Sequence, residues 1–234
     1  MIEGKDVEIT THARIAVVGV GGAGNRVITD MYNALAPVHT IAINTDKNAL
    51  HLDTKADQKI YICKEVLKGE GTRGDATLGK RCAEIHRQEI KDALKGYDYV
   101  FVVAGLGGGT GSGAAPVIID IAESLKCSVF AIMIKPFSFF EMNRVPVATE
   151  SLSKIKTVCS SVTVIENDKV LEVLPDVRTE VALRIVNRSI MDFILNSMKQ
   201  IDEETMNVLG NRPDKSDDVV TDVDTVPITT LMKA

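Results

Sequence analysis

Two glycine-rich loops are the parts of this sequence best suited to bind phosphate. The first occupies residues 19–25, between an apolar run and a helical pattern, and the second, residues 105–113, contains six glycines in nine positions. Glycine lets the backbone turn sharply and brings bare N–H groups close to an anion, and a following helix adds its dipole. Thr110 and Ser112 add hydroxyl donors to the second loop. Because so many glycines cost conformational entropy, we interpret this loop as a site for a di- or triphosphate.

The first loop also fits the pattern GxGxxG, with Gly19, Gly21 and Gly24 at the glycine positions. Asp46 follows about 20 residues later, as dinucleotide-binding folds require. An NAD-dependent oxidoreductase is therefore one alternative, and a tight strand-to-helix turn without a ligand is another. The second glycine loop argues against the oxidoreductase, and so do the histidines, none of which stands in a plausible catalytic context. They are His12, His39, His51 and His86.

A third glycine-containing segment, residues 69–75, connects a short apolar run to a helical pattern. Its glycines would let it order against the terminal phosphate of a nucleotide. Loops that order in this way convert the state of a bound nucleotide into a change of conformation.

Apolar runs alternate with helical patterns along most of the chain, which indicates a parallel sheet covered by helices on both faces. We therefore predict an α/β fold with a Rossmann-like parallel sheet, closed by a long helix. The expected strands are residues 14–18, 40–44, 59–63, 97–104, 128–134 and 161–166. The expected helices before the long one are residues 25–35, 77–94, 114–125, 145–159 and 169–174.

The long helix is expected at about residues 180–201, where apolar residues recur at intervals of three and four. Its length would be about 30 Å, and its wide apolar arc predicts packing on more than one side. After Gly210 the sequence becomes polar and acidic with little periodicity. We predict one nucleotide-binding domain at residues 12–210 and a disordered acidic tail at residues 211–234.

Composition narrows the classes of protein. The chain has 234 residues and a net charge of −5, with no basic run, which argues against nucleic acid as a partner. No apolar stretch is long enough to cross a bilayer, so we expect no direct membrane insertion. The N-terminus does not resemble a signal peptide, and we expect a cytoplasmic protein.

The four cysteines are widely spaced and never form a CxxC pair, so neither a zinc site nor a redox motif is predicted. We expect all of them to be buried free thiols. They are Cys63, Cys82, Cys127 and Cys159.

Five motifs together resemble the tubulin/FtsZ family of GTPases, and FtsZ more than tubulin. The motifs are GGAGN at 21–25, INTD at 43–46, GLGGGTGSGAAP at 105–116, KPF at 135–137 and END at 166–168. The resemblance covers roughly residues 13–200. It implies a GTPase domain that binds GTP or GDP, with Mg²⁺ bridging the phosphates and no protein acid assigned to the metal.

The resemblance also implies a set of nucleotide-binding residues. The first glycine loop would touch the phosphates, Gly74 would lie near the γ-phosphate, and the second glycine loop would cradle the β- and γ-phosphates. Arg144 would lie near the ribose and base, and Asn167 would bind the guanine edge. The full set is Gly21, Gly22, Ala23, Gly24, Asn25, Asn44, Asp46, Gly74, Gly107, Gly108, Gly109, Thr110, Gly111, Glu141, Arg144, Asn167 and Asn187.

Two of these residues depart from the family pattern. Phe140 stands where the ribose-binding Glu is expected, and a shift of one residue would let Glu141 replace it. Asn187 stands where FtsZ presents an Asp to guanine. An Asn can accept from guanine N–H groups and donate to O6, but its hydrogen bonds are weaker than those of a carboxylate.

A third departure concerns catalysis. In FtsZ the long helix leads into an NxDxxD loop, whose acids act on the nucleotide of the next subunit, and then into a second domain. That pattern does not follow the helix here, and we expect the second domain to be missing; the acids in the corresponding stretch are Asp202, Glu203 and Glu204. They are candidate catalytic residues, and solvated acids at a helix end are the alternative. We expect weak or partner-dependent GTP hydrolysis.

The leading hypothesis is an FtsZ-like GTP-binding protein of the cytoskeleton or of cell division. It would self-associate as filaments, or as dimers through the long helix, and would reach a membrane adaptor through its tail. The alternative is a nucleotide-binding regulator that caps full-length FtsZ homologues.

Overall fold

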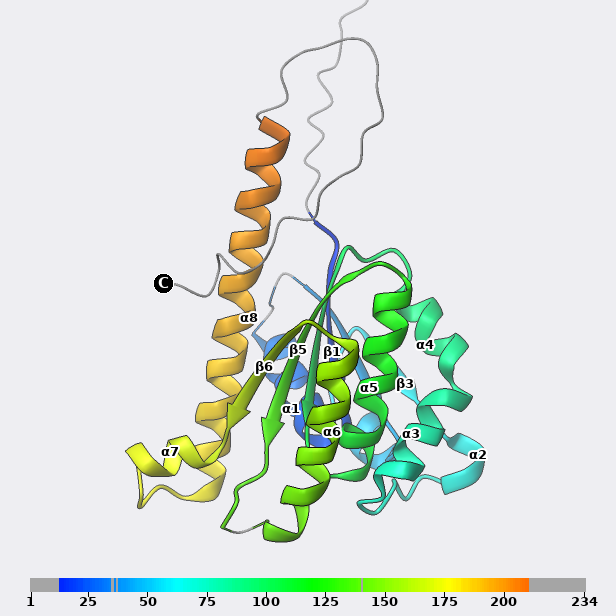
Figure 1. Ribbon diagram of the computed structural model, residues 1–234, viewed down its shortest axis with the longest axis vertical. Coiled ribbons are helices and arrows are strands. Elements are labelled where there is room, and N and C mark those ends of the chain that lie inside the picture. Colours follow the sequence, from blue (N-terminus) through cyan, green and yellow to red (C-terminus); the bar gives the residue numbers. More distant parts are fainter. Residues whose placement is uncertain (1–12, 35, 37, 140, 211–234) are drawn as a thin grey trace, which may run out of the picture.

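A six-stranded parallel sheet forms the centre of the molecule (Figure 1). The computed structural model describes residues 13–34, 36, 38–139 and 141–210. The strand order is β3-β2-β1-β4-β5-β6. The strands are β1 (Ile15–Val20), β2 (His39–Asn44), β3 (Gln58–Tyr61), β4 (Tyr99–Gly105), β5 (Ser128–Lys135) and β6 (Ser161–Glu166). The predicted parallel α/β class is confirmed.

The central strands are apolar because both of their faces are covered. Every residue of β1 is buried, and Val17 pairs with Thr40 of β2 on one side and Phe101 of β4 on the other. The outermost strand β6 pairs only with β5, and all of its residues are half-buried. Because all neighbouring strands are parallel, their carboxyl ends meet at one edge of the sheet, where parallel α/β folds place their binding sites.

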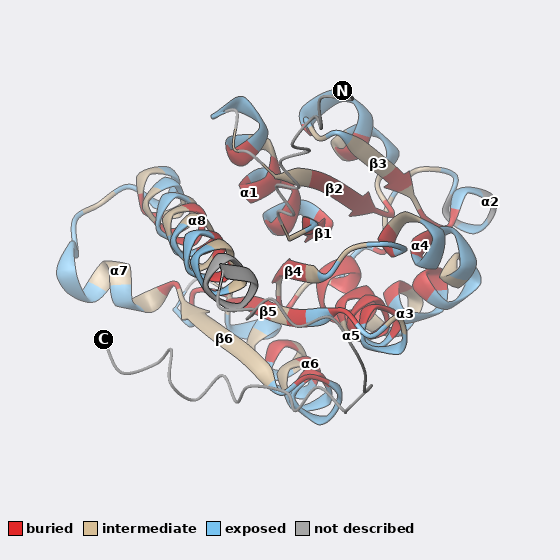
Figure 2. Ribbon diagram, turned by 90° about the horizontal axis from the view of Figure 1, so that it is seen from above, coloured by how far each residue is buried: buried red, intermediate tan, exposed pale blue. Residues whose placement is uncertain are grey.

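Helices cover both faces of this sheet (Figure 2). Helices α3, α4, α5 and α6 bury apolar residues on one face, and α1 and α8 do so on the other. The helices are α1 (Gly21–Asn33), α2 (Lys64–Leu67), α3 (Ala76–Ile85), α4 (Arg87–Leu94), α5 (Gly109–Ser124), α6 (Val145–Val158), α7 (Asp168–Val173) and α8 (Thr179–Gly210). A π-helical turn at Ala49–Asp53 and a 3-10 turn at Met142–Arg144 complete the described elements.

The prediction of one helix at 77–94 is wrong, because the chain bends at His86 and forms α3 and α4. His86 has φ −96° and ψ 18°, outside the helical region, while its N–H still bonds to the carbonyl of Cys82 at 3.2 Å. Both pieces keep an apolar face on the sheet, and for this reason the apolar periodicity continues across the bend.

The long helix extends beyond its predicted end at residue 201 and finishes at Gly210. Residues 202–209 contain neither Gly nor Pro, so nothing in the sequence interrupts the helix there. Figure 1 shows α8 running against the direction of the strands and extending beyond the opposite edge of the sheet. Asp202, Glu203 and Glu204 are thus helical residues.

In the single chain, α8 packs along one face only, so the expected packing on more than one side is wrong. Val186, Ile190 and Ile194 are buried against the sheet, whereas Arg188 on the outer face is exposed. Phe193 also lies on the outer face and is 41% exposed. Apolar residues on either side of this buried face of α8 are half-buried, and they account for the wide apolar arc in the sequence.

The cysteine prediction is wrong for two of the four residues. Cys63, just after β3, and Cys82 in α3 form a disulfide with their Cα atoms 4.9 Å apart. Their separation of 19 positions in the sequence does not reveal that packing of α3 on the sheet edge brings them together. Cys127 and Cys159 are buried free thiols, as expected, and burial raises the pKa of both.

The predicted tail at 211–234 lies outside the described residues. Among the described residues, no helix is both long and apolar enough to cross a membrane.

Candidate nucleotide site

A cleft of about 860 Å³ lies at the carboxyl edge of the sheet. Its walls come from the loops after β1, β2, β4, β5 and β6, from the segment before α3 and from the start of α8. Twelve of the residues named from the sequence line it: Gly22, Ala23, Asp46, Gly74, Gly108, Gly109, Thr110, Gly111, Glu141, Arg144, Asn167 and Asn187.

The other named glycines shape the loops around the cleft. Gly21 has φ +70° and packs against the backbone of Gly111, where a side chain would be strained. Gly24 is buried against the carbonyl of Val103, so its role in the structure is close packing of α1 on β4. Gly107 has φ +91° and donates its N–H to the Ser112 hydroxyl at 2.7 Å, which holds the turn into α5.

Two asparagines from the first motifs are buried beside the cleft. Asn44 accepts hydrogen bonds from the N–H groups of Thr45, at 2.8 Å, and Asp46, at 3.2 Å, and so fixes the turn that presents Asp46. Asn25 is 2% exposed, and neither its amide nitrogen nor its amide oxygen has a partner. A buried amide without partners is costly, and Asn25 is not among the residues that line the cleft.

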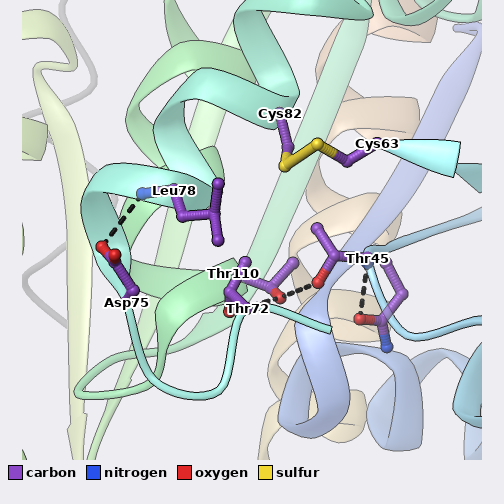
Figure 3. The surroundings of a disulfide bond; sticks show 8 residues. Thr45, Cys63, Thr72, Asp75, Leu78, Cys82 and Thr110 are labelled. Atoms are coloured by element: carbon purple, nitrogen blue, oxygen red, sulfur yellow. Dashed lines mark hydrogen bonds between the residues drawn. A yellow bond between two sulfur atoms is a disulfide. The ribbon is translucent and has the colours of Figure 1, made fainter. Parts of the chain in front are cut away.

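Three threonine hydroxyls, two from loops and one from the first turn of α5, lie close together (Figure 3), and all three residues line the floor of the cleft. The Thr110 hydroxyl oxygen lies 2.7 Å from that of Thr45 and 3.4 Å from that of Thr72. Thr45 was not predicted, although it lies inside the INTD motif, and Thr72 lies inside the segment expected near the terminal phosphate. The three segments therefore meet through hydroxyl groups that can also donate to phosphate oxygens.

The start of α5 supplies the main group of backbone donors. Gly108 precedes the helix with φ −94° and ψ 172°, and no side chain caps its first turn. The first N–H groups of a helix have no partner within the helix, and the dipole adds positive charge there. Because Gly108–Gly111 line the cleft, this helix end is suited to an anion.

Most charged groups of the cleft are paired. Arg73 pairs with Glu70, and Arg144 pairs with Glu141. Lys135, at the end of β5, lies 2.8 Å from the carboxylate of Glu166 and lowers the pKa of that acid. These cations are held at the cleft by neighbouring acids and are available to an anionic ligand.

Arg26 is a cleft cation that none of the sequence motifs predicts. It lies on α1 immediately after the GGAGN motif, and its side chain is exposed at the cleft. Its position in the first turns of a helix that begins at a glycine loop is the feature of the sequence that could have indicated its place at the cleft.

Asn167 and Asn187 lie at the other end of the cleft, near β6 and α8. Asn167 is 4% exposed, and its side-chain oxygen has no partner. Asn187 donates a hydrogen bond from its amide nitrogen to the carboxylate of Asp30 at 3.1 Å, and this contact orients its side-chain amide. Glu141, named as a ribose ligand, accepts from the N–H of Phe137 at 3.2 Å.

The candidate catalytic acids lie away from the cleft. Asp202 follows Asn187 along α8 by about 22 Å at 1.5 Å per residue. Glu204 lies near Tyr99, at the amino edge of the sheet, where burial first and the charge of Glu204 second raise the pKa of the phenol. The acids of one chain are thus at the opposite pole from its own cleft.

The sequence of residues 14–175 matches the family model described as the tubulin/FtsZ family, GTPase domain. The chain belongs to the tubulin/FtsZ family. The glycine loops that line the cleft fall inside the matched range, and so does Asn167. The resemblance stated from the motifs is confirmed.

Several FtsZ proteins are similar to this chain in sequence. Cell division protein FtsZ 1 of Methanocaldococcus jannaschii is 36% identical over 194 residues, which are 82% of this chain and 52% of that protein. FtsZ 1 of Pyrococcus furiosus is 38% identical over 192 residues, 82% of this chain and 50% of its own. The chain spans about half the length of the curated relatives it matches.

Solved structures of two similar proteins share this fold over most of the chain. An empty FtsZ dimer from M. jannaschii is 35% identical, with a TM-score of 0.78, and the match covers 83% of this chain and 57% of that one. A GTPγS-bound protofilament of CetZ2 from Haloferax volcanii is 25% identical, with a TM-score of 0.72 over 84% of this chain and 63% of that one.

Proposed function

We propose that this chain binds GTP or GDP in the cleft and that nucleotide binding is coupled to self-association. The observation that carries the proposal is a single cleft that joins the bare N-terminus of α5 to a buried asparagine without a partner for its oxygen, Asn167. The first feature suits a polyphosphate, and the second suits the polar edge of a base.

The strand order supports one orientation of the nucleotide. The segment containing Gly71–Gly74 lies on the β3 side of the cleft, the loops of Ala23 and Gly109 lie over the central strands, and Asn167 follows β6. The phosphates would therefore lie over the centre and toward β3, with the terminal phosphate near Gly74. The base would lie toward β6 and the start of α8.

Guanine is the base that the amides fit. An asparagine can accept from the N–H groups of guanine and donate to its O6, and Asn167 and Asn187 line the same end of the cleft. The pair of Arg144 and Glu141 lies between the two ends, where a ribose would sit.

We also propose Mg²⁺ as the partner of the phosphates. Mg²⁺ in nucleotide sites is held by phosphate oxygens together with one or two carboxylates. Asp46 and Glu70 are the carboxylates on the phosphate side of the cleft, so they are the groups suited to hold it. When bound, the ion would offset the negative charge of the phosphates.

Self-association would bring the two poles of the molecule together. Asp202, Glu203 and Glu204 cannot reach the cleft of their own chain, but in a head-to-tail contact they would face the cleft of the next copy. Hydrolysis would then depend on assembly, and a free chain would turn over GTP slowly. A role in cell division or the cytoskeleton is proposed from the names of the relatives, which are cell division proteins.

The test is a titration of the protein with a fluorescent GTP analogue, followed by GTP turnover and light scattering over a series of protein concentrations. We expect saturable binding that GTP and GDP displace and that ATP and NADH do not. Turnover per chain should rise with concentration together with scattering. Binding of NADH instead of GTP would overturn the proposal, and turnover independent of concentration would overturn the role of assembly.

A further inference from the structure

The Cys63–Cys82 disulfide closes a loop at the phosphate side of the cleft. Cys63 follows β3, Cys82 lies in α3, and both are buried, with 1% and 0% of their surface exposed. Figure 3 shows the bond joining α3 to the end of β3, with the group of threonines below it in that view. The bond ties together the two ends of the segment 64–81.

The enclosed segment carries part of the cleft wall. Residues 70–74 line the cleft, and the Thr72 hydroxyl lies 3.4 Å from that of Thr110 in the second glycine loop. The carbonyl of Thr72 accepts the N–H of Asp75 at 2.9 Å, and the Asp75 carboxylate caps α3 through the N–H of Leu78 at 3.0 Å. The position of this wall therefore depends on the start of α3.

Both anchors of the disulfide belong to elements that build the phosphate site. Helix α3 packs so closely on α5 that a Cβ on Gly79 would overlap the carbonyl of Gly109. On the other side, the N–H of Ile62 bonds to the carbonyl of Asn44 at 3.0 Å, next to the threonine floor of the cleft. The disulfide thus fixes the spacing between two walls of one site.

The backbone is unusual at one anchor and at two positions between the anchors. Cys63, Lys68 and Arg73 are non-glycine residues with positive φ, at 67°, 48° and 49°. Such conformations are costly for L residues and persist only where the surroundings hold them. Beyond the disulfide, the hydrogen bond from Lys47 N–H to the Gly69 carbonyl at 3.1 Å is one of the ties that hold the segment.

We propose that Cys63 and Cys82 form a redox modification site that clamps the segment 64–81 over the phosphates, so that the oxidised protein releases nucleotide more slowly than the reduced one. The effect on nucleotide rests on the proposed function.

The chemistry needs an oxidant, and a low-molecular-weight disulfide supplies it. When the segment 64–81 opens and exposes one cysteine, its thiolate attacks that disulfide and releases one small thiol, and the second cysteine then displaces the other. The Cys63–Cys82 bond forms, the two protein thiols lose two electrons and two protons, and the small disulfide becomes two thiols. A dithiol reductant reverses each step.

The first experiment uses the full chain, oxidised with glutathione disulfide or reduced with dithiothreitol. Peptide mass mapping without reduction should find the Cys63–Cys82 link after oxidation and no link after reduction. The reduced protein should release a fluorescent GTP analogue about tenfold faster, because a preorganised loop is no longer held. Cys82→Ala should release at the faster rate in both conditions, whereas Cys127→Ala, which removes a buried thiol outside the pair, should keep the redox response. Absence of the link, or equal release rates, would overturn the proposal.

A second readout does not depend on nucleotide. Trypsin cleaves after Lys68 and Arg73, which are exposed within the enclosed segment. We expect slower cleavage there in the oxidised protein, with all samples reduced before electrophoresis. Equal cleavage rates would show that the disulfide does not clamp the segment. If no guanine nucleotide binds in either state, the proposed function fails, and the trypsin rates still decide whether the clamp exists.

Discussion

The side chain of Asn167 is buried and its oxygen has no partner, so replacing it should weaken nucleotide binding strongly and change the stability of the free protein little. Asn167→Ala removes the proposed contact with guanine, so GTP affinity should fall by about tenfold to a hundredfold. The free energy of unfolding without nucleotide should hardly fall, because no hydrogen bond of the Asn167 oxygen is lost and the side chain does not cap α7. Nucleotide titration and urea unfolding measure the two effects. Unchanged GTP affinity would remove Asn167 from the site.

Two adjacent glycines of the second loop differ in the space around them. A Cβ on Gly109 would overlap the Thr72 hydroxyl and lie 2.7 Å from the carbonyl oxygen of Asp75, whereas a Cβ on Gly108 would meet nothing within 4 Å. Gly109→Ala should lower the free energy of unfolding by about 1–3 kcal/mol. Gly108→Ala is the matched control and should change it by less than about 0.5 kcal/mol. Urea unfolding of both variants checks the difference, and equal losses would contradict it.

The residues of the cleft could be predicted where a motif implied a backbone requirement. Gly108–Gly111 and Gly74 were found from glycine density, and they line the cleft. Gly24 was named from the same pattern but packs against β4, because a sequence does not distinguish a glycine that faces a ligand from one that faces a strand. Thr45 and Arg26 were missed because their places in the cleft follow from how the loops meet in space.

The buried face of α8 should carry most of the stability that this helix contributes. Ile194 is fully buried against the sheet, and its neighbour Phe193 is 41% exposed on the outer face. Ile194→Ala should cost about 2–5 kcal/mol of unfolding free energy through the cavity that it leaves. Phe193→Ala removes a larger side chain but should cost only about 1–2 kcal/mol, since its burial is partial and its loss opens a surface groove rather than an internal cavity. Thermal and urea unfolding compare the pair, and a larger loss for Phe193→Ala would contradict the packing described for α8.

The disulfide links two elements that are separated by 19 positions in the sequence. Closing a loop of this length restricts the unfolded chain and should add about 3 kcal/mol to the stability of the oxidised protein. Urea unfolding with and without dithiothreitol measures the difference. Cys82→Ala should abolish the effect of the reductant, and a reductant effect that persists in this variant would assign it to another group.

The helices and strands could be predicted well where burial determines the pattern of apolar residues in the sequence. The apolar runs placed all six strands, and β6 was predicted with its observed bounds. The bend at His86 was missed because the apolar face continues on both sides of it. The end of α8 was missed because the apolar periodicity breaks at residues 202–205, which are Asp, Glu, Glu and Thr, although no Gly or Pro interrupts the helix there.

Replacing the acids at the far end of α8 tests whether GTP hydrolysis depends on assembly while GTP binding does not. Replacing Asp202, Glu203 and Glu204 with their amides should leave GTP affinity unchanged, because the cleft is at the other pole. Turnover at concentrations that produce scattering should fall on the order of a hundredfold, as expected for loss of acid–base assistance. Glu172→Gln, an exposed change on α7, is the control and should keep full turnover. Loss of affinity in the triple variant, or full turnover, would contradict this division.

The parallel sheet also determines when the protein can fold during synthesis. Strand β1 is made first but occupies the centre of the sheet, and its partner β4 begins only at Tyr99. The cleft draws on residues from Gly22 to Asn187, so a nascent chain cannot gain stability from nucleotide until the start of α8 has left the ribosome. Pairings between distant segments form slowly and leave apolar strands exposed. The ribosome-bound chain therefore carries β1, every residue of which is buried in the folded protein, without a complete set of partners for much of its translation, and chaperones that shield such strands should matter most in that interval.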